Sequence, residues 1–328
     1  MWHIIELVFP YAIMYTVPLL ITALGGLYSE RSGIVNIGLE GLMIIGSFTG
    51  ALTIYLIQGI QVTDNTAAWI KFIVKSDMSI WIGLLAAVIG GVLVSLLHAY
   101  ASINLNANQV ISGTAINMIA AAITVFLARN ITGSGNIKIT AFTPMAPEFL
   151  TNIPIIGPLF FNRAYWTTLL VLVILFISAF ALYKTAFGLR LRSCGEYPQA
   201  AEAAGISVRK MRYIGVMMSG ALAGLGGATI LVTYSGQFTG SVSGLGFLAL
   251  AALIFGQWKP FGILWATLFF GFATTIANVS TVIPALDVIP PLFLKIFPYV
   301  VTLIALIIFS KSTQAPKAAG EPFDSGKR

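Results

Sequence analysis

The stretch "YWTTLLVLVILFISAFALY", residues 165–183, decides the fold class of this chain. It carries no charged residue over 19 positions, and a helix needs about 20 apolar residues to cross the hydrocarbon core of a bilayer. The whole chain of 328 residues shares this bias, with 58% hydrophobic residues, 9% charged residues and a mean hydropathy of +0.92. Ordinary soluble domains carry about a quarter charged residues. We therefore predict an all-α, polytopic helical membrane protein.

Nine apolar segments, within a range of 8 to 10, have the length and hydropathy of membrane spans. The segment at 246–257 is too short for an ordinary span, so a tilted, broken or re-entrant element is expected there. We expect one transmembrane domain over residues 1–310 and a disordered tail over 311–328, where small and polar residues dominate. The nine segments lie near residues 7–27, 34–57, 80–103, 110–128, 165–183, 213–233, 246–257, 261–280 and 292–309.

The distribution of cations predicts the orientation. An outside N-terminus puts 12 lysine and arginine residues in the cytoplasm and 5 outside, with Lys295 left at the start of the last span. This bias is the one that the positive-inside rule favours, and it predicts a cytoplasmic C-terminus. The net charge of +7 is then explained by membrane orientation, and we expect no nucleic-acid partner.

The sequence contains no pattern of residues typical of a metal site, a cofactor site or an active site. The chain has one cysteine, Cys194, and two histidines, His3 and His98, which cannot assemble a zinc or haem cluster. His98 lies on an apolar helix, where a packing role is more common than a proton relay. The phosphate-binding pattern GxxxxGK[ST] is absent from the sequence, and no catalytic constellation is present. We predict that the chain is not an enzyme and binds no metal or cofactor.

Two glycine-rich features point to close packing and to an internal repeat. Gly220 and Gly224 have the GxxxG spacing of closely packed membrane helices. The stretches "YSERSGIVNIGLEGLMIIGS" (28–47) and "YSGQFTGSVSGLGFLALAALIFG" (234–256) both open with Tyr-Ser and enter an apolar helix through a glycine. They begin at opposite faces of the membrane, as in an inverted repeat whose interrupted helices line a path at the midplane.

Polar residues within these spans are the candidates for a substrate path. Glu40 is a carboxylate at membrane depth, which favours a functional role, although a place near the interface, a pair with Arg31 or a helix-capping role would also account for it. For Ser112 and Asn117, hydrogen bonding between helices is the alternative. The candidates are Asn36, Glu40, Gln109, Ser112, Asn117, Gly244 and Gly246.

A polar loop, "CGEYPQAAEAAGISVRKMR" (194–212), lies within the segment 184–212 between two spans. Pro198 suits the first turn of a helix, Gly205 is placed to end it, and Ser207 can cap the next helix. The alanines leave a face with little side-chain bulk, which favours docking to another protein over a solvated linker. The residues expected to dock are Gly195, Glu196, Pro198, Ala200, Ala201, Ala204 and Gly205.

This loop resembles the coupling loop of ABC importer permeases of the branched-chain amino acid, simple sugar and nucleoside superfamily. "SGIVNIGLEGLMIIGSFTGA" (32–51), "NANQVISGTAINMIA" (106–120) and "GLGFLALAALIFGQWKPFG" (244–262) are similar to the same superfamily, most closely to its nucleoside branch. The resemblance implies a type II importer-like fold in the cytoplasmic membrane and nucleoside cargo.

The resemblance also implies three partners: a cytoplasmic ABC ATPase, a second permease chain of different sequence and an extracellular substrate-binding lipoprotein. Ribose, another simple sugar or a branched-chain amino acid are alternative cargoes. A secondary transporter or channel that works alone is the alternative class.

Overall fold

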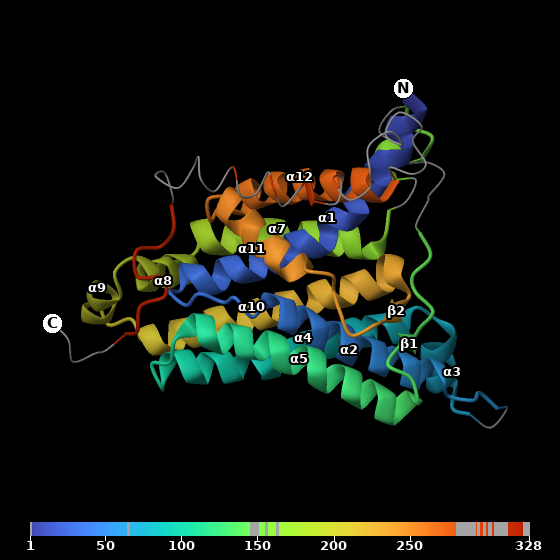
Figure 1. Ribbon diagram of the computed structural model, residues 1–328, viewed down its shortest axis with the longest axis horizontal. Coiled ribbons are helices and arrows are strands. Elements are labelled where there is room, and N and C mark those ends of the chain that lie inside the picture. Colours follow the sequence, from blue (N-terminus) through green and yellow to red (C-terminus); the bar gives the residue numbers. More distant parts are fainter. Residues whose placement is uncertain are drawn as a thin grey trace.

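The computed structural model describes residues 2–63, 66–144, 151–154, 157–161, 164–279 and 314–323, with five single positions between 293 and 304. Helices dominate these residues, and one two-stranded antiparallel sheet joins two loops (Figure 1). The long helices are α1 (Trp2–Arg31), α2 (Leu39–Gln58), α4 (Met78–Ile103), α5 (Gln109–Thr132), α7 (Trp166–Lys184), α10 (Val208–Ile230) and α12 (Pro260–Val279). The shorter elements are α3 (Ala68–Lys75), β1 (Ile137–Lys138), η1 (Gly157–Phe161), α8 (Ala186–Glu196), α9 (Pro198–Ala203), η2 (Leu231–Ser235), β2 (Gln237–Phe238) and α11 (Leu245–Phe255).

Seven helices in the described part of the chain are long and apolar enough to cross a membrane. The predicted all-helical, polytopic class is confirmed. Each of the first six predicted spans and the one at 261–280 coincides with one of these helices. The predicted segment 246–257 is the 11-residue helix α11, about half the length of a span. The ninth predicted span, 292–309, lies outside the described residues apart from the single positions.

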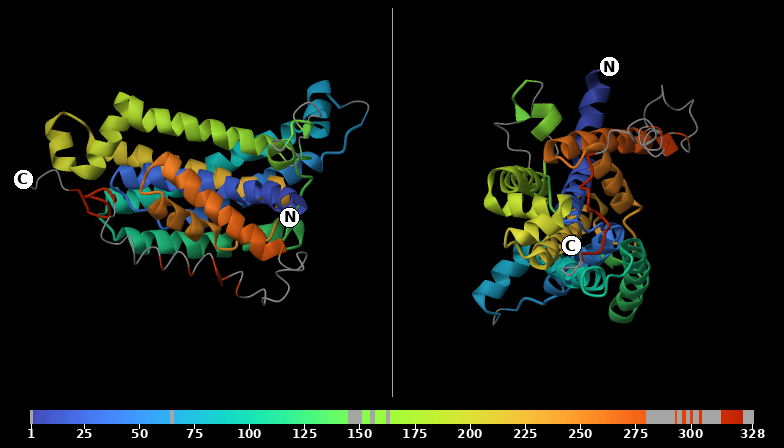
Figure 2. Two further views of the ribbon diagram at one scale, coloured as in Figure 1. Left: turned by 90° about the horizontal axis from the view of Figure 1, so that it is seen from above. Right: turned by 90° about the vertical axis from the view of Figure 1, so that its left-hand side faces the viewer.

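Helices α1 and α10 form the centre of the bundle. Within their most apolar windows, 72% of α1 and 78% of the α10 span are buried, against 22% of α5 and 28% of α7. Helix α10 packs on α4, α1 and α2, and α1 packs on α12 and α11. The view along the bundle in Figure 2 shows α4 and α5 on one side of this centre and α7 and α12 on the other. The exposed apolar faces of α5 and α7 are therefore the surfaces suited to lipid or to a second subunit.

The centre packs with direct backbone contact. A Cβ on Gly220 would lie 2.4 Å from the carbonyl oxygen of Gly91, and a Cβ on Gly224 would lie 2.4 Å from that of Ala87. Side chains cannot fit there, so α10 and α4 approach through glycine. This confirms that the GxxxG spacing reports close helix packing.

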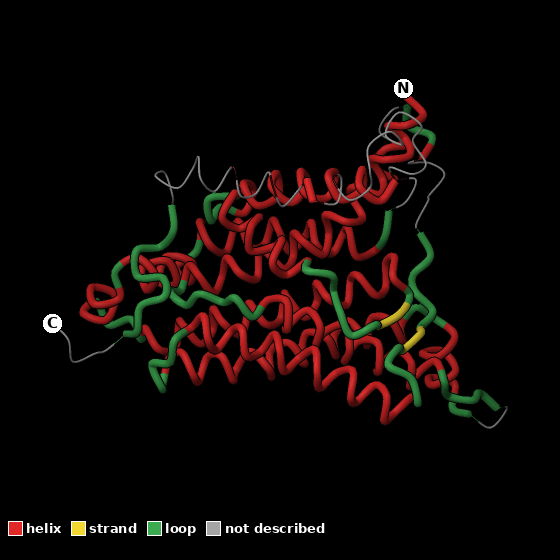
Figure 3. The backbone as a smooth tube through the Cα atoms, viewed as in Figure 1, coloured by secondary structure: helices red, strands yellow, loops and turns green. Residues whose placement is uncertain are grey.

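Two non-helical segments interrupt the bundle. Residues 32–38 follow α1 and lead into α2, while residues 236–244 follow η2 and lead into α11. Figure 3 shows both as loops that enter the helical layer from opposite ends. From their meeting point α2 runs toward the end that carries α3, and α11 runs toward the end that carries α9 (Figure 1). These are called the α3 end and the α9 end below. The arrangement is the one expected for the inverted repeat.

Part of the predicted C-terminal tail is described by the structure. Residues 314–323 lie against the α9 end, where Pro316, Ala318 and Phe323 are buried. Disorder is predicted from low hydrophobicity, but here small residues and one aromatic ring find a surface that the rest of the chain provides. The remaining tail residues lie outside the described part.

Gly224→Val tests the glycine contact at the centre of the bundle. The added side chain meets backbone of α4, which cannot rotate away, so we expect a loss of about 3 kcal/mol or more in stability and a clearly lower melting temperature of the detergent-solubilised protein. Gly135→Ala is the matched control, because the Cβ there would meet only the flexible Arg129 and Val125 side chains, at 3.5 Å or more. Equal melting temperatures for the two variants would contradict this packing.

Candidate functional site

The N-termini of the two interrupted helices meet at Glu40. Glu40 lies in the first turn of α2, and its carboxylate reaches the start of α11. Oε1 accepts a hydrogen bond from the Gly244 amide at 2.9 Å, and Oε2 accepts one from the Gly246 amide at 2.7 Å. Hydrogen bonds to a charged group are each worth about 1.5–3 kcal/mol. One carboxylate therefore stabilises the positive ends of two helix dipoles at once.

Gly246 allows this contact. A Cβ at position 246 would lie 2.4 Å from the Glu40 backbone nitrogen and Cα atom. In the two similar sequences, "GLE" at 38–40 corresponds to "GLG" at 244–246, so the glycine of one repeat makes room for the carboxylate of the other. Of the alternatives for Glu40, the structure shows the helix cap. Arg31 instead bonds the Trp258 carbonyl oxygen and pairs with Glu196 at 3.4 Å.

The unwound backbone at 32–38 is held by side chains of α4 and α5. Gln109 Oε1 accepts from the Val35 amide at 2.7 Å, and His98 Nε2 contacts the Val35 carbonyl oxygen at 3.1 Å. Since that carbonyl can only accept, Nε2 carries the proton, and Nδ1 can accept from the Ser112 hydroxyl at 3.0 Å. His98 is fully buried and serves here as a backbone partner.

Asn36 and Asn117 complete this support. Asn36 donates to Ser219 Oγ at 2.9 Å and accepts from the Gly38 amide at 3.1 Å. Asn117 donates to the Ile37 carbonyl oxygen at 3.1 Å and accepts from the Gly41 amide at 2.7 Å. Peptide groups at membrane depth need such partners because lipid supplies none. The structure thus brings four of the five polar candidates, Asn36, Gln109, Ser112 and Asn117, together around the segment 32–38, with hydrogen bonds to its backbone or to the side chains that hold it. The fifth, Glu40, bonds the α11 amides instead.

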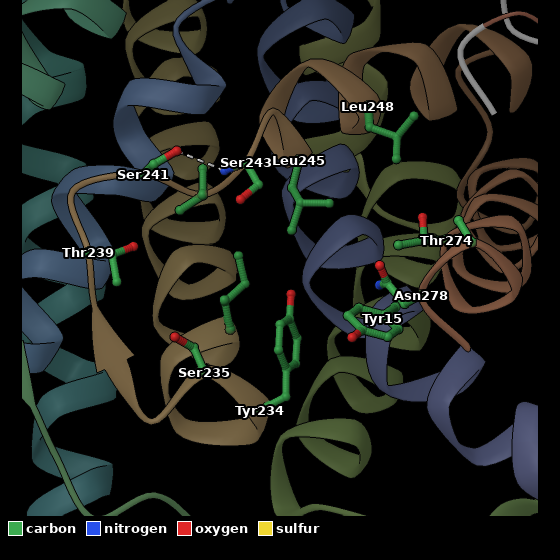
Figure 4. Close-up of a pocket in the computed structure, with 13 residues that line it drawn as sticks. Tyr15, Tyr234, Ser235, Thr239, Ser241, Ser243, Leu245, Leu248, Thr274 and Asn278 are labelled. Carbon is green, nitrogen blue, oxygen red and sulfur yellow. Dashed lines mark hydrogen bonds between the residues drawn. The ribbon is translucent and has the colours of Figure 1, made fainter. Parts of the chain in front are cut away.

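A cavity of about 490 Å³ opens beside the start of α11, toward the α3 end. Figure 4 shows Tyr234 pointing into it, with Ser235, Thr239 and Ser241 on one side and Tyr15 and Asn278 on the other. The Tyr15 and Tyr234 rings lie 4.9 Å apart between centroids, tilted by 59°. The lining residues are Tyr15, Ile230, Tyr234, Ser235, Thr239, Ser241, Val242, Ser243, Leu245, Leu248, Thr274, Ala277 and Asn278.

The lining is polar without charge. Among the described residues that line the cavity there are hydroxyl groups, one carboxamide and apolar side chains, but no lysine, arginine, aspartate or glutamate. Of the candidates predicted from the sequence, Gly244 and Gly246 flank the lining residue Leu245. The remaining candidates belong to, or pack beside, the segment 32–41 and do not line the cavity. Tyr15 and Asn278 were missed because single polar residues near apolar runs give no local signal. The Tyr-Ser pair at 234–235 was noticed only as part of the repeat.

The loop at the α9 end folds as its turn residues predict. Pro198 is the first residue of α9, and Gly205 follows the helix with a φ of +80°, a conformation that favours glycine. Ser207 Oγ accepts from the Lys210 amide at the start of α10. Pro198 and Ala201 are buried against the protein, whereas Ala200 and Ala204 are exposed. The small residues that face outward are therefore Ala200, Ala203, Ala204 and Gly205, whereas Ala201 belongs to the core.

A groove of about 530 Å³ lies between α8 and the turn that joins α9 to α10. Leu189 on its rim is 63% exposed. The groove combines apolar side chains with two cations, Arg190 and Lys210. Such a mixed surface at the end of a helical bundle suits contact with a protein outside the membrane.

Comparison with known proteins decides the family. Residues 9–306 match the family described as branched-chain amino acid transport system / permease component. The chain belongs to this permease family. It is therefore a multi-pass membrane subunit of a transporter family, and not a catalytic enzyme.

Two relatives match the permease over nearly its whole length. The guanosine ABC transporter permease protein NupQ of Bacillus subtilis is 45% identical, with 99% of each chain covered. The nucleoside ABC transporter permease protein NupC of Lactococcus lactis is 41% identical, with 96% of each chain covered. A putative glucose ABC transporter permease of Haloferax volcanii is 32% identical, covering 77% of this chain and 71% of the relative. No solved structure matches.

The C-terminal segment 314–323 straps the α9 end of the permease. The Ala318 amide donates to the Gly195 carbonyl oxygen at 2.9 Å, and the Gly320 amide donates to that of Gly33 at 3.2 Å. Arg212 Nη1 donates to the Glu321 carbonyl oxygen at 3.0 Å, and its guanidinium lies 5.7 Å from the centre of the Phe323 ring. The strap thus connects the end of α8 to the turn that opens the unwound segment.

The rate at which maleimide labels Cys194 measures how tightly the strap packs. The thiol is buried, and burial raises its pKa above the usual value. The reactive thiolate is therefore scarcer than in a free cysteine at any pH below the raised pKa, so maleimide should label the native permease slowly and faster as the pH rises. We expect Phe323→Ala to loosen the strap beside Gly195 and to raise the labelling rate about tenfold.

The exposed Lys317→Ala is the matched control within the strap, and its labelling rate should equal that of the unchanged protein. Since Cys194 is the single cysteine of the chain, labelling followed by mass spectrometry reads this site alone. An unchanged rate in Phe323→Ala would show that the strap does not protect the thiol.

Proposed function

We propose that this permease translocates nucleosides across the cytoplasmic membrane as the pore-forming subunit of an ATP-driven ABC importer. The observation that carries the proposal is the near full-length similarity to two permeases named for guanosine and nucleoside transport. The cavity at Tyr15 and Tyr234 supports the same cargo, because it joins two aromatic rings to several hydroxyl groups.

The chemistry of a nucleoside fits this lining. A nucleoside presents a flat, polarizable base and an uncharged ribose, which suit aromatic faces and neutral hydrogen-bonding groups respectively. The volume of about 490 Å³ is in the usual range for a small-molecule site. A branched-chain amino acid carries an ammonium and a carboxylate, and burying either charge without a partner is costly. The uncharged lining therefore favours a neutral cargo.

The distribution of cations supports a cytoplasmic α9 end and an outside N-terminus. In this orientation the exposed alanines and the groove beside α8 face a cytoplasmic ABC ATPase. Movement of α8 would pass to α1 through the Arg31–Glu196 pair and through the strap, and from there to the interrupted segment. A second permease chain and an extracellular binding lipoprotein complete the proposed importer.

Tyr234→Ala tests the cargo site. Loss of one aromatic wall should raise the KM for nucleoside uptake at least about fivefold, since base–aromatic stacking is worth about 1–3 kcal/mol. Tyr234→Phe keeps the ring and should change KM less than threefold. The measurement is uptake of labelled guanosine in cells with and without this chain, competed by unlabelled nucleosides, ribose and leucine. Competition by ribose or leucine but not by nucleosides would contradict the proposed cargo.

Ala200→Arg tests the docking face. The exposed alanine becomes a bulky cation on the surface proposed for the ATPase, so we expect uptake to fall at least tenfold while the permease remains in the membrane. Ala200→Ser keeps a small side chain and should retain uptake. Ala201 is unsuited to this test because it is buried, and a charge there would damage the fold. Full uptake with Ala200→Arg would show that this face is not where the ATPase docks.

A further inference from the structure

Glu40 lies where its negative charge can affect whether the cavity accepts a charged or a neutral cargo. The free N-terminus of a membrane half-helix attracts anions, because its amides are unpaired and its dipole is positive. Here the amides of Gly244 and Gly246 already bond the Glu40 carboxylate. The flanking residues Ser243 and Leu245 line the cavity proposed for the cargo.

We propose that Glu40 makes the permease selective for uncharged cargo by occupying the α11 amides that a carboxylate or phosphate would otherwise bind. The inference rests on the proposed function, which places the cargo in this cavity. It names a selectivity residue that acts from outside the cavity, because Glu40 is not among the lining residues.

The surroundings of Glu40 leave its charge unopposed by a cation. Among the described residues, no lysine, arginine or histidine makes an ion pair or hydrogen bond with Glu40, and Arg31 is engaged with Glu196 and Trp258. The described residues that line the cavity include no cation either. A phosphate that enters the cavity therefore meets the negative charge of the nearby Glu40 carboxylate, while the Gly244 and Gly246 amides are already bonded. A neutral nucleoside carries no charge for this carboxylate to repel.

The contact is built for a carboxylate of this length. Both oxygens are used, one for each amide, and Gly246 leaves the space that the Glu40 backbone needs. Glutamine at position 40 would keep the shape and one acceptor while it removes the charge. Aspartate would keep the charge on a shorter side chain. Comparing Glu40→Gln with Glu40→Asp therefore separates the effect of the negative charge on cargo selectivity from the effect of side-chain length.

The experiment measures binding of labelled guanosine to the purified, detergent-solubilised transporter complex without its binding protein. Two competitors are compared: guanosine 5′-monophosphate, and its dimethyl ester, which has a similar 5′ group but no charge. With the unchanged permease, the ester should compete at least tenfold better than the monophosphate. Glu40→Gln should reduce this ratio at least fivefold, whereas Glu40→Asp, which keeps the negative charge but is too short to bond both amides, should reduce it less than Glu40→Gln does.

Thr239→Lys changes the charge of the cavity lining without altering the hydrogen bonds between Glu40 and α11. Thr239 is an exposed lining residue, and a cation there should also improve competition by the monophosphate at least fivefold. A ratio that stays unchanged in Glu40→Gln, while Thr239→Lys lowers it, would overturn the selectivity role and leave the proposed function standing. If the unchanged complex binds no labelled nucleoside, the proposed function fails, and the selectivity role fails with it.

Discussion

The fold depends on one hydrogen-bonded contact, the carboxylate of Glu40 against the first amides of α11. Two half-buried helix starts face each other in the middle of an apolar bundle, and each would carry unpaired amides and a positive dipole end. Lipid cannot satisfy these groups. The Glu40 carboxylate bonds the first amides of α11, and Asn117 accepts from the Gly41 amide at the start of α2. The carboxylate thereby fixes the position of the segment that forms one wall of the cavity. This contact constrains both the fold and the proposed transport, because the start of α11 cannot move without breaking its hydrogen bonds to Glu40.

The rest of the bundle keeps this contact in place. Glycines at the contact of α10 with α4 remove side-chain bulk and give the centre a rigid backbone packing. Gln109, His98 and Asn117 hold the unwound segment that precedes α2. At the α9 end, the Arg31–Glu196 pair and the C-terminal strap tie the end of α8 to the start of this segment. A displacement of α8 by a partner has a continuous path of contacts to Glu40.

Much of the fold is predictable from the sequence because its signals are local. Apolar runs predict the long helices, Pro198 and Gly205 mark the ends of α9, and GxxxG spacing predicts the contact of α10. The contacts of the site are harder to predict from the sequence. The partners of Glu40 lie more than 200 residues away, at Gly244 and Gly246. From the sequence alone, a functional role and the structural alternatives for this carboxylate therefore stay open. The composition of the tail does not reveal that Phe323 packs against Arg212. Likewise, an alanine-rich loop does not say that Ala201 faces inward while Ala200 faces outward.

A cryo-EM structure of the complete transporter with a nucleoside bound would test the central claim most directly. We expect density for the nucleoside in the cavity beside Tyr15 and Tyr234, with the Glu40 carboxylate still on the amides of Gly244 and Gly246. A nucleoside bound elsewhere in the permease, or one that displaces Glu40 from those amides, would contradict it.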